Sequence, residues 1–311
     1  MTLSSPTIGW IGAGRMGYQL IARLLEAGYD VSVYNRTRSK AEPLAGLGAT
    51  IVDRPVDLSD RDIVFSMVSA SSDLHQVMTG EGGLLTGTSA PRIIADSSTV
   101  SAEASEELRA AAKARGTELL ATPVSGNPAV IAAGKLTLAV SGSRAVFDEI
   151  EPVLNVLGRG VTYVGEGEVA RLVKIAHNVF LGVVTQSLAE ITVLAERGGV
   201  SRAAFLEFLN DSVMGSTFTR YKSPALVNLD FAPTFTNVLL NKDIELGLDA
   251  GKKLGVPMPI ASATGQLVAS AIGAGYTDED FATLLLEQAR RSGYEVVSED
   301  VPVKSGLEID Q

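Results

Sequence analysis

A glycine-rich turn near the amino terminus constrains the fold of this chain more than any other stretch. The sequence GAGRMG, residues 12–17, follows an apolar run at residues 7–11 and leads into a helical pattern and a second apolar run at residues 31–34. In a strand, turn, helix and strand of about 30 residues, the first glycine permits a tight turn and the second lets a pyrophosphate approach the backbone. The third allows close packing of helix and strand, and the helix amino terminus receives the phosphate charge. A purely structural turn is the alternative; we predict dinucleotide binding by Gly12, Gly14, Arg15, Met16 and Gly17.

The residues after the second predicted strand indicate which dinucleotide is bound. An acidic residue there would bind the ribose 2′-hydroxyl of NAD, whereas this chain has Asn35, Arg36 and Thr37, with Arg38 and Lys40 beyond. A guanidinium suits a 2′-phosphate, and a carboxylate would repel it. We therefore predict NADP(H) as the cofactor, with a solvated basic loop as the alternative.

Apolar segments and helical patterns continue to alternate as far as residue 164. Strands are predicted at residues 50–52, 63–68, 93–95, 118–121, 136–140 and 161–164, and helices near 101–115 and 145–157. This alternation indicates an α/β fold with a Rossmann-type doubly wound sheet, forming a dinucleotide-binding domain over residues 1–164. Ligands of such sheets bind beyond the carboxyl ends of strands, here at Met67 and Val68 and at residues 96–99, although ordinary turns have the same composition.

The segment ATPVSGNP, residues 121–128, suggests an anion site. Asn127 followed by Pro128 is typical of the N-cap and first residue of a helix. The backbone amides of residues 125–127 and the positive end of the helix dipole would then form a cradle for a carboxylate. A plain helix start is the alternative.

A long helix is predicted at residues 169–196, where a pair of glycines follows it. At 1.5 Å per residue it would be roughly 40 Å long. Its faces are almost wholly apolar, so we expect it to be buried, with Lys174 and Asn178 one turn apart on the same side and His177 in the core. A buried ammonium is costly unless something uses it. The charged residues along the helix favour a core helix over a membrane span.

After the long helix the strand patterns disappear. Helical spacing then predominates, at residues 202–210, 235–254, 261–273 and 278–291. We therefore predict an all-α domain over residues 165–295, joined to the sheet by the central helix. Within it Phe235 and Lys242 are two turns apart and would share one face of a helix. The polar tail, residues 296–311, is expected to be loose or to dock on a partner subunit.

Composition argues against several classes of partner. The net charge of −10 and the pI near 4.8 give no overall basic field for nucleic acid or an anionic membrane. The absence of cysteine, the two histidines and the lack of metal-ligand spacing argue against a metal site. We see no secretory signal and expect a cytoplasmic protein. The apolar carboxy-terminal domain is too small to cover a long helix alone, so we expect a homodimer or homotetramer.

Four segments in this order resemble the β-hydroxyacid dehydrogenase family, which includes 3-hydroxyisobutyrate dehydrogenases, tartronate semialdehyde reductases and glyoxylate/succinic semialdehyde reductases. The segments are GAGRMG, TPVSGNPAVIAAGKL, GEGEVARLVKIAHN and FTNVLLNKDIELGL. The resemblance implies that Lys174 is catalytic and that Asn178 binds substrate. It also implies a substrate loop at Ser125, Gly126 and Asn127, and cofactor contacts at Thr99, Phe235 and Lys242. Asn127 and His177 replace a glycine and an asparagine found in many members.

The resemblance implies an NADP-dependent oxidoreductase that interconverts a small aldehyde acid, of the semialdehyde or glyoxylate type, and its hydroxy acid. Lys174 could donate a proton to the developing alkoxide, or remove it in the reverse direction. Two alternatives are an imine reductase, which shares the architecture but generally lacks the lysine, and a non-catalytic NADP-binding protein.

Overall fold

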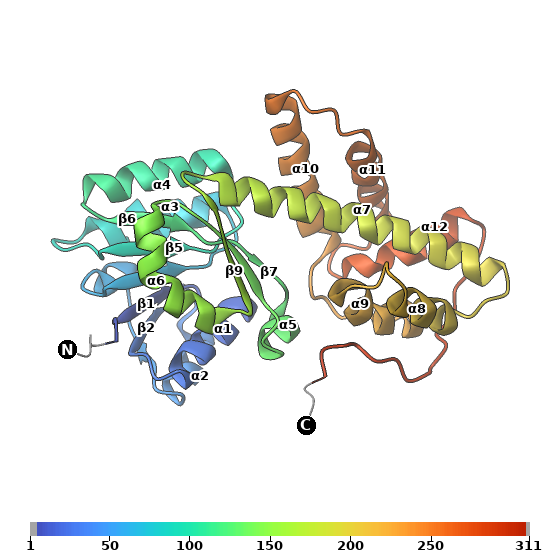
Figure 1. Cartoon of the computed structure of the whole chain (residues 1–311), viewed down its shortest axis with the longest axis horizontal. Coiled ribbons are helices and arrows are strands. Elements are labelled where there is room, and N and C mark those ends of the chain that lie inside the picture. Colours follow the sequence, from blue (N-terminus) through green and yellow to red (C-terminus); the bar gives the residue numbers. More distant parts are fainter. Residues whose placement is uncertain (1–4, 309–311) are drawn as a thin grey trace. The chain divides into compact units, whose positions relative to one another are not determined.

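The computed structural model describes residues 5–308, which divide into two compact units that meet between Lys174 and Ile175. The boundary lies inside a single helix, α7 (Val169–Arg197), and each unit is described by itself. Unit 1 contains the sheet and the helices that cover it, and unit 2 is helical (Figure 1). The predicted fold class, a Rossmann-type sheet followed by an all-α region, is confirmed.

The sheet of unit 1 has the order β3-β2-β1-β4-β5-β6-β8-β7, with β9 beside β8. Its strands are β1 (Ile8–Ile11), β2 (Val31–Tyr34), β3 (Thr50–Ile51), β4 (Ile63–Ser66), β5 (Ile93–Asp96), β6 (Glu118–Ala121), β7 (Val124–Ser125), β8 (Thr137–Ser141) and β9 (Gly160–Gly165). The pairs from β3 to β6 are parallel, whereas β8 runs antiparallel to β6 and β7. The order reverses between β1 and β4, which is where doubly wound sheets bind dinucleotides.

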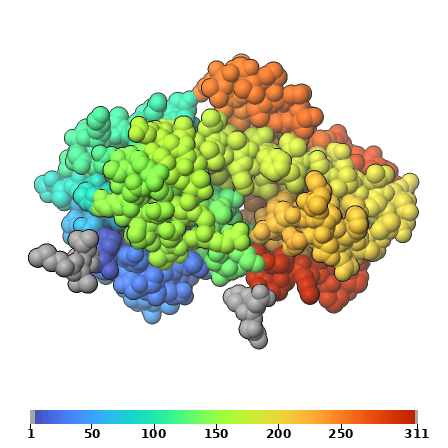
Figure 2. Space-filling model, in the orientation of Figure 1, coloured from blue at the N-terminus to red at the C-terminus, as the bar shows by residue number. Residues whose placement is uncertain are grey.

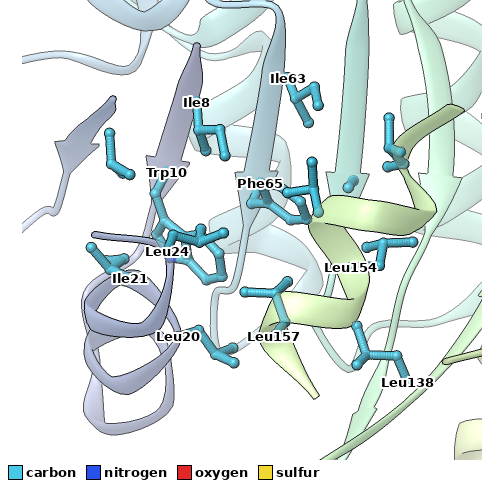
Figure 3. Packing of buried hydrophobic residues seen from close by; sticks show 14 of the residues in the cluster. Ile8, Trp10, Leu20, Ile21, Leu24, Ile63, Phe65, Leu138, Leu154 and Leu157 are labelled. Atoms are coloured by element: carbon cyan, nitrogen blue, oxygen red, sulfur yellow. The ribbon is translucent and has the colours of Figure 1, made fainter. Parts of the chain in front are cut away.

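Helices cover both faces of this sheet. They are α1 (Arg15–Glu26), α2 (Glu42–Ala45), α3 (Ser71–Thr79), α4 (Ala102–Ala114), α5 (Pro128–Ala132) and α6 (Arg144–Leu157), with short 3₁₀ turns at Arg38–Lys40, Pro55–Leu58 and Leu84–Thr86. On one face Trp10 stacks on Phe65 with ring centroids 5.3 Å apart, and Leu20 of α1 and Leu157 of α6 pack around them (Figure 3). Ile11, the next residue of β1, belongs to the core on the other face. Neighbouring strand residues thus fill two cores, as burial on both faces requires.

Unit 2 continues α7 and adds further helices around one core. They are α8 (Arg202–Asp211), α9 (Thr217–Asn228), α10 (Asn237–Leu254), α11 (Pro259–Gly273) and α12 (Leu284–Arg291), preceded by a 3₁₀ turn at Phe281–Thr283. Leu188, Leu240 and Leu285 are among the buried residues of this core. The sequence patterns did not predict α9, which has Pro224 inside it, nor α3 and β7 of unit 1.

Within the single chain, helix α7 is buried on one side and exposed on the other. Asn178 is 3% exposed, whereas Phe180 is 68% and Leu194 is 72% exposed. Lys174 is half-buried, and His177 is exposed rather than a core residue. Residues of α7, coloured yellow-green to yellow, are therefore visible at the surface in Figure 2. By length and composition alone α7 could cross a membrane, and half of its most apolar window is buried within the chain.

The carboxy-terminal segment docks on its own unit as far as Gly306, which lies against Arg220 of α9. Residues 309–311 of the predicted tail lie outside the described residues. Glu299 accepts from the backbone of Arg202 at 2.6 Å and of Ala203 at 3.1 Å, at the first turn of α8. Asn228 donates to the Val301 carbonyl oxygen at 2.8 Å. The described part is therefore not loose, because the Glu299 carboxylate meets the positive end of α8. Docking of the tail on a partner subunit stays a prediction.

Candidate active site

The glycine turn between β1 and α1 has the predicted geometry. Gly12 has φ +102°, and a Cβ there would lie 2.2 Å from the Met67 carbonyl oxygen. A Cβ on Gly17 would lie 2.0 Å from the Gly12 carbonyl oxygen, so both positions require glycine. A Cβ on Gly14, the N-cap of α1, would meet no described atom within 4 Å. Two glycines thus permit the close packing, and the third leaves the amino terminus of α1 open to a ligand.

Asn35, at the end of β2, ties this turn to the basic loop. Its Oδ1 accepts a hydrogen bond from Ala13 N at 2.8 Å, and its Nδ2 donates to the Thr37 carbonyl oxygen at 2.8 Å. One side chain therefore sets the distance between the glycine turn and the backbone that carries Arg36.

Arg36 lies at the surface, with a side chain that is 80% exposed. Its Nη1 is 2.7 Å from Asp73 Oδ1 of α3, while Arg38 pairs with Asp53. The predicted phosphate-binding guanidinium is therefore available, but a carboxylate already contacts it. A 2′-phosphate would compete with Asp73 for the same donors.

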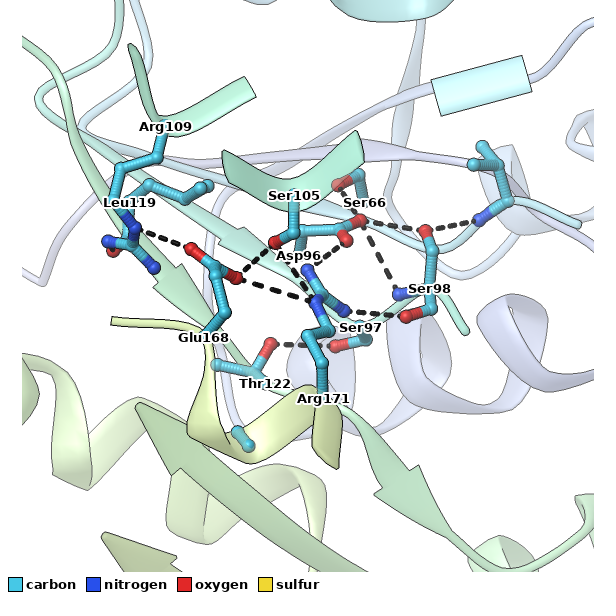
Figure 4. A network of polar contacts seen from close by, with 12 residues as sticks. Ser66, Asp96, Ser97, Ser98, Ser105, Arg109, Leu119, Thr122, Glu168 and Arg171 are labelled. Carbon is cyan, nitrogen blue, oxygen red and sulfur yellow. Dashed lines mark hydrogen bonds and ion pairs between the residues drawn. The ribbon is translucent and has the colours of Figure 1, made fainter. Parts of the chain in front are cut away.

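The carboxyl end of β4 lies next to the glycine turn in the sheet, and that of β5 lies one strand further along. The Met67 carbonyl packs against Gly12, and Val68 N donates to Ser98 Oγ at 2.9 Å. Thr99 is partly exposed. Asp96, part of the stretch 96–99 predicted to face a ligand, is instead fully buried in the polar network of Figure 4.

That network was not anticipated from the sequence. Asp96 pairs with Arg171 of α7 at 2.5 Å, and both side chains are buried. In the sequence analysis Arg171 was only one of the charged residues that favoured a core helix over a membrane span. The pair joins residues 75 positions apart, a contact that no local pattern indicates.

The predicted helix start at Asn127 is confirmed. Asn127 is 7% exposed and its Oδ1 accepts from Val130 N at 2.9 Å, which caps α5. Gly126 has φ +143°, and a Cβ there would lie 2.8 Å from the Val130 side chain. Ser125 pairs with Thr137 at the end of β7. These contacts hold both ends of the loop, and Gly126 is exposed within it.

In unit 2, Asn178 is buried against α10. Its Nδ2 donates to Asp243 Oδ2 at 2.5 Å, and its Oδ1 lies 2.9 Å from His177 Nδ1. Lys242 Nζ is 3.4 Å from Asp243 Oδ1, and its side chain is 40% exposed. Sequence reasoning overlooked Asp243, although it directly follows Lys242. A buried carboxylate thus brings two predicted site residues of unit 2, Asn178 and Lys242, together.

Phe235 does not share a helix with Lys242, so that prediction is wrong. Helix α10 begins at Asn237, because Thr236 is its N-cap and accepts from Leu239 N at 3.3 Å. Phe235 lies in the preceding loop and contacts Phe281 edge-on, with ring centroids 5.8 Å apart.

Comparison with known proteins identifies the family. Residues 7–165 match the family described as the NAD binding domain of 6-phosphogluconate dehydrogenase, and residues 165–287 match that described as NAD-binding of NADP-dependent 3-hydroxyisobutyrate dehydrogenase. The chain is 31% identical over 291 residues to 2-(hydroxymethyl)glutarate dehydrogenase from Eubacterium barkeri, covering 93% of this chain and 97% of that protein. The chain belongs to the β-hydroxyacid dehydrogenase family.

Other members of the β-hydroxyacid dehydrogenase family are similar over most of their length. The chain is 28% identical over 284 residues to glyoxylate/succinic semialdehyde reductase 2, chloroplastic, from Arabidopsis thaliana, covering 91% of this chain and 79% of that protein. A crystal structure of 3-hydroxyisobutyrate dehydrogenase from Salmonella typhimurium superposes with a TM-score of 0.82 at 26% identity, covering 91% of this chain and 99% of that one. The chain is therefore an oxidoreductase that acts on the CH–OH group of a hydroxy acid.

A β-hydroxyacid dehydrogenase needs a nicotinamide dinucleotide, and the glycine turn of unit 1 fits one. The space in front of the amino terminus of α1 is open, because Gly14 has no side chain there and no described atom lies within 4 Å of where its Cβ would be. A pyrophosphate in that space could contact the helix amides. Arg15 and Met16 follow in the first turn of that helix, and no carboxylate stands there to repel a phosphate.

Proposed function

We propose that this enzyme uses NADPH to reduce a small aldehyde acid, of the glyoxylate or semialdehyde type, and that Lys174 supplies the proton. The observation that carries the proposal is the half-buried Lys174 near the start of α7, in the same unit as the dinucleotide turn. The similarity to a glyoxylate/succinic semialdehyde reductase supports the substrate class.

In this mechanism the bound cofactor supplies hydride, and the side chains of the chain manage charge and position. Lys174, as an ammonium, donates a proton to the developing alkoxide and stabilises its negative charge. In oxidation the neutral amine accepts the proton. Asn178, one turn further along α7, holds a substrate oxygen.

The remaining predicted site residues have separate roles in the proposal. The loop at Ser125, Gly126 and Asn127 binds the substrate carboxylate through backbone amides. By the family resemblance, Phe235 and Lys242 would hold the nicotinamide end of the cofactor. Thr99, Met67 and Val68 would hold it at the carboxyl ends of the strands.

The proposal is tested by following NADPH absorbance with purified protein and a panel of small carbonyl compounds. The panel contains glyoxylate, succinic semialdehyde and a cyclic imine. We expect consumption of NADPH with at least one aldehyde acid and none with the imine. Turnover of the imine alone would identify an imine reductase, and no turnover with any compound would favour a non-catalytic NADP-binding protein.

Arg36 determines the preference for NADPH in this proposal. A guanidinium–phosphate contact contributes roughly 1.5–3 kcal/mol, so Arg36→Asp should weaken NADPH binding about tenfold to a hundredfold. Binding of NADH should stay unchanged or improve. Arg92→Asp is the matched control, because Arg92 is also exposed and paired with a carboxylate, that of Glu149, but it precedes β5 at the amino end of the parallel strands, away from the glycine turn. Equal losses for both cofactors, measured by fluorescence titration, would show that Arg36 only supports the loop.

We further propose that a second copy of the chain covers the exposed side of α7. Val173, Phe180 and Leu194 are 42%, 68% and 72% exposed and lie at multiples of seven residues, hence on one face. Light scattering at micromolar concentration should show at least a dimer, and Phe180→Glu should shift it toward monomer. Phe208→Glu, at a position that is 72% exposed on α8, is the control. A monomeric parent protein would contradict the proposal.

A further inference from the structure

The buried guanidinium of Arg171 links the start of α7 to the carboxyl end of strand β5. Arg171 is 1% exposed and donates from Nη2 to Asp96 Oδ2 at 2.5 Å and from Nη1 to the Ser98 carbonyl oxygen at 2.6 Å. Its Nε donates to Ser105 Oγ of α4 at 3.1 Å. The side chains of Arg171, Asp96 and Ser105 point toward one another in Figure 4. One side chain of α7 therefore contacts the end of β5, the loop after it and α4.

Asp96 extends this connection toward the glycine turn. Its Oδ1 accepts from Ser66 Oγ of β4 at 2.6 Å and from Ser98 Oγ at 2.7 Å. Ser98 Oγ in turn accepts from Val68 N at 2.9 Å. Val68 directly follows Met67, whose carbonyl oxygen packs against Gly12. A continuous series of contacts thus runs from the dinucleotide turn to the first turn of α7.

Other contacts already attach the start of α7 to unit 1. Ala170 N donates to Ser141 Oγ at 3.1 Å, and Glu168 pairs with Arg109 at 2.5 Å. A buried ion pair is also a weak source of stability, because desolvation of the two charges offsets much of their attraction. A planar guanidinium with directed donors does, however, fix geometry. What Arg171 adds is therefore a defined rotation of α7 about its own axis.

We propose that Arg171 is a positioning residue for the reduction and acts through Lys174. Lys174 follows Arg171 by three residues, so its side chain leaves the helix about 60° around the axis from that of Arg171. The network holds this direction relative to the carboxyl edge of the sheet, where the cofactor binds. Misplacing a reacting group by about 1 Å can slow a reaction about a hundredfold. The inference rests on the proposed role of Lys174.

The test combines Arg171→Lys with Lys174→Met. Arg171→Lys keeps the charge and removes the three directed donors. With NADPH and the most active aldehyde of the panel, we expect turnover to fall about tenfold to a hundredfold while NADPH affinity is unchanged. In the Lys174→Met background the same change should cause no further loss. The pH profile of turnover should also shift in Arg171→Lys, because the environment of the lysine ammonium changes.

Arg202→Lys is the matched control. Arg202 is also fully buried, pairs with Glu196 at 2.5 Å and donates to the carbonyl oxygen of Leu226, but these contacts lie at the other end of α7. It should lower thermal stability without changing turnover. Hydrogen exchange in the cofactor-free protein gives a second readout: Arg171→Lys should speed exchange of the amides at residues 170–176, and Arg202→Lys should not.

The outcomes separate the two proposals. If Lys174→Met turns over like the parent, the proposed role of Lys174 fails and this inference fails with it. If Lys174→Met is inactive but Arg171→Lys behaves like Arg202→Lys, or slows both backgrounds equally, only the positioning role is overturned. Should Arg171→Lys fail to fold, Ser105→Ala removes a single acceptor of the guanidinium and should give a smaller loss of turnover, again only when Lys174 is present.

Discussion

Two buried ion pairs, Arg171 with Asp96 in unit 1 and Lys222 with Asp280 in unit 2, are built in different ways. In unit 1 the cation is the branching point, since the donors of Arg171 reach three separate segments. In unit 2 the anion is the branching point. Asp280 accepts from Lys222 Nζ at 2.6 Å, from Thr234 N at 2.9 Å and from Thr234 Oγ1 at 2.6 Å.

Each pair holds a segment that carries a predicted site residue. Arg171 precedes Lys174 by one turn of α7, and Asp280 binds the loop that contains Phe235. Phe281 N donates to the Phe235 carbonyl oxygen at 3.0 Å, which ties that loop to the residue after Asp280. The chain thus fixes two pieces of its candidate site with buried charges.

The two cations differ in their response to pH. A guanidinium stays protonated throughout the range in which proteins fold. Burial lowers the pKa of Lys222 from its ordinary value of 10.5, although the ion pair and hydrogen bond with Asp280 oppose this shift. Of these two pairs, only the one in unit 2 can therefore lose its cation at a pH below 10.5, the ordinary pKa of lysine.

The largest loss of stability should come from removing Asp280, the carboxylate that accepts the hydrogen bonds of the unit 2 pair. Asp280→Ala leaves the Lys222 ammonium buried beside Phe281 and removes the acceptor of the 234–235 backbone. Breaking a buried pair in this way costs about 3–5 kcal/mol. Urea unfolding measures the change, and a loss below about 1 kcal/mol would show that water enters the site and solvates the ammonium.

Lys222→Met should cost less than Asp280→Ala. The carboxylate keeps its hydrogen bonds from Thr234 and from Ala282 N, the latter at 2.9 Å. The variant loses the ammonium's hydrogen bonds to Asp280 and to Thr234 Oγ1, and the charged one to Asp280 contributes about 1.5–3 kcal/mol. The lost desolvation cost of the ammonium offsets part of this. If both variants lost equal stability in the same urea experiment, the asymmetry between anion and cation would be wrong.

The smallest effect concerns pH. Because the folded pKa of Lys222 lies below its unfolded value of 10.5, the unfolded chain holds more protons between these two values. The free energy of unfolding of the parent protein should therefore rise with pH in that window. The free energy of unfolding of Lys222→Met should rise less. The comparison stays below pH 10, because burial raises the pKa of Tyr221 above 10 and opposes the trend at higher pH. Identical slopes would exclude titration of Lys222.

Features with a local cause were predictable from the sequence. The close approach of Gly17 to Gly12 lies within one strand–turn–helix unit, and the cap at Asn127 depends on a residue three positions on. The contact of Gly12 with the Met67 carbonyl, by contrast, joins it to the end of β4. The parallel strands were recognisable because burial on both faces makes them continuously apolar.

Features that depend on remote partners were not predictable. Which side of α7 is exposed depends on the helices that pack on it, so His177 was misplaced in the core. Asp96 and Asp243 were overlooked as partners, because Arg171 and Asn178 lie 75 and 65 positions away. Phe235 was assigned to a helix because its spacing from Lys242 fits one, whereas the Thr236 cap starts the helix two residues later.

The central claim, that Lys174 transfers the proton, is tested most directly by the turnover of Lys174→Met. The variant should fold and bind NADPH normally, yet reduce the best aldehyde of the panel about a hundredfold to ten-thousandfold more slowly. Lys113→Met, at an exposed position of α4, is the control and should match the parent. A folded Lys174→Met protein with near-normal turnover would contradict the mechanism.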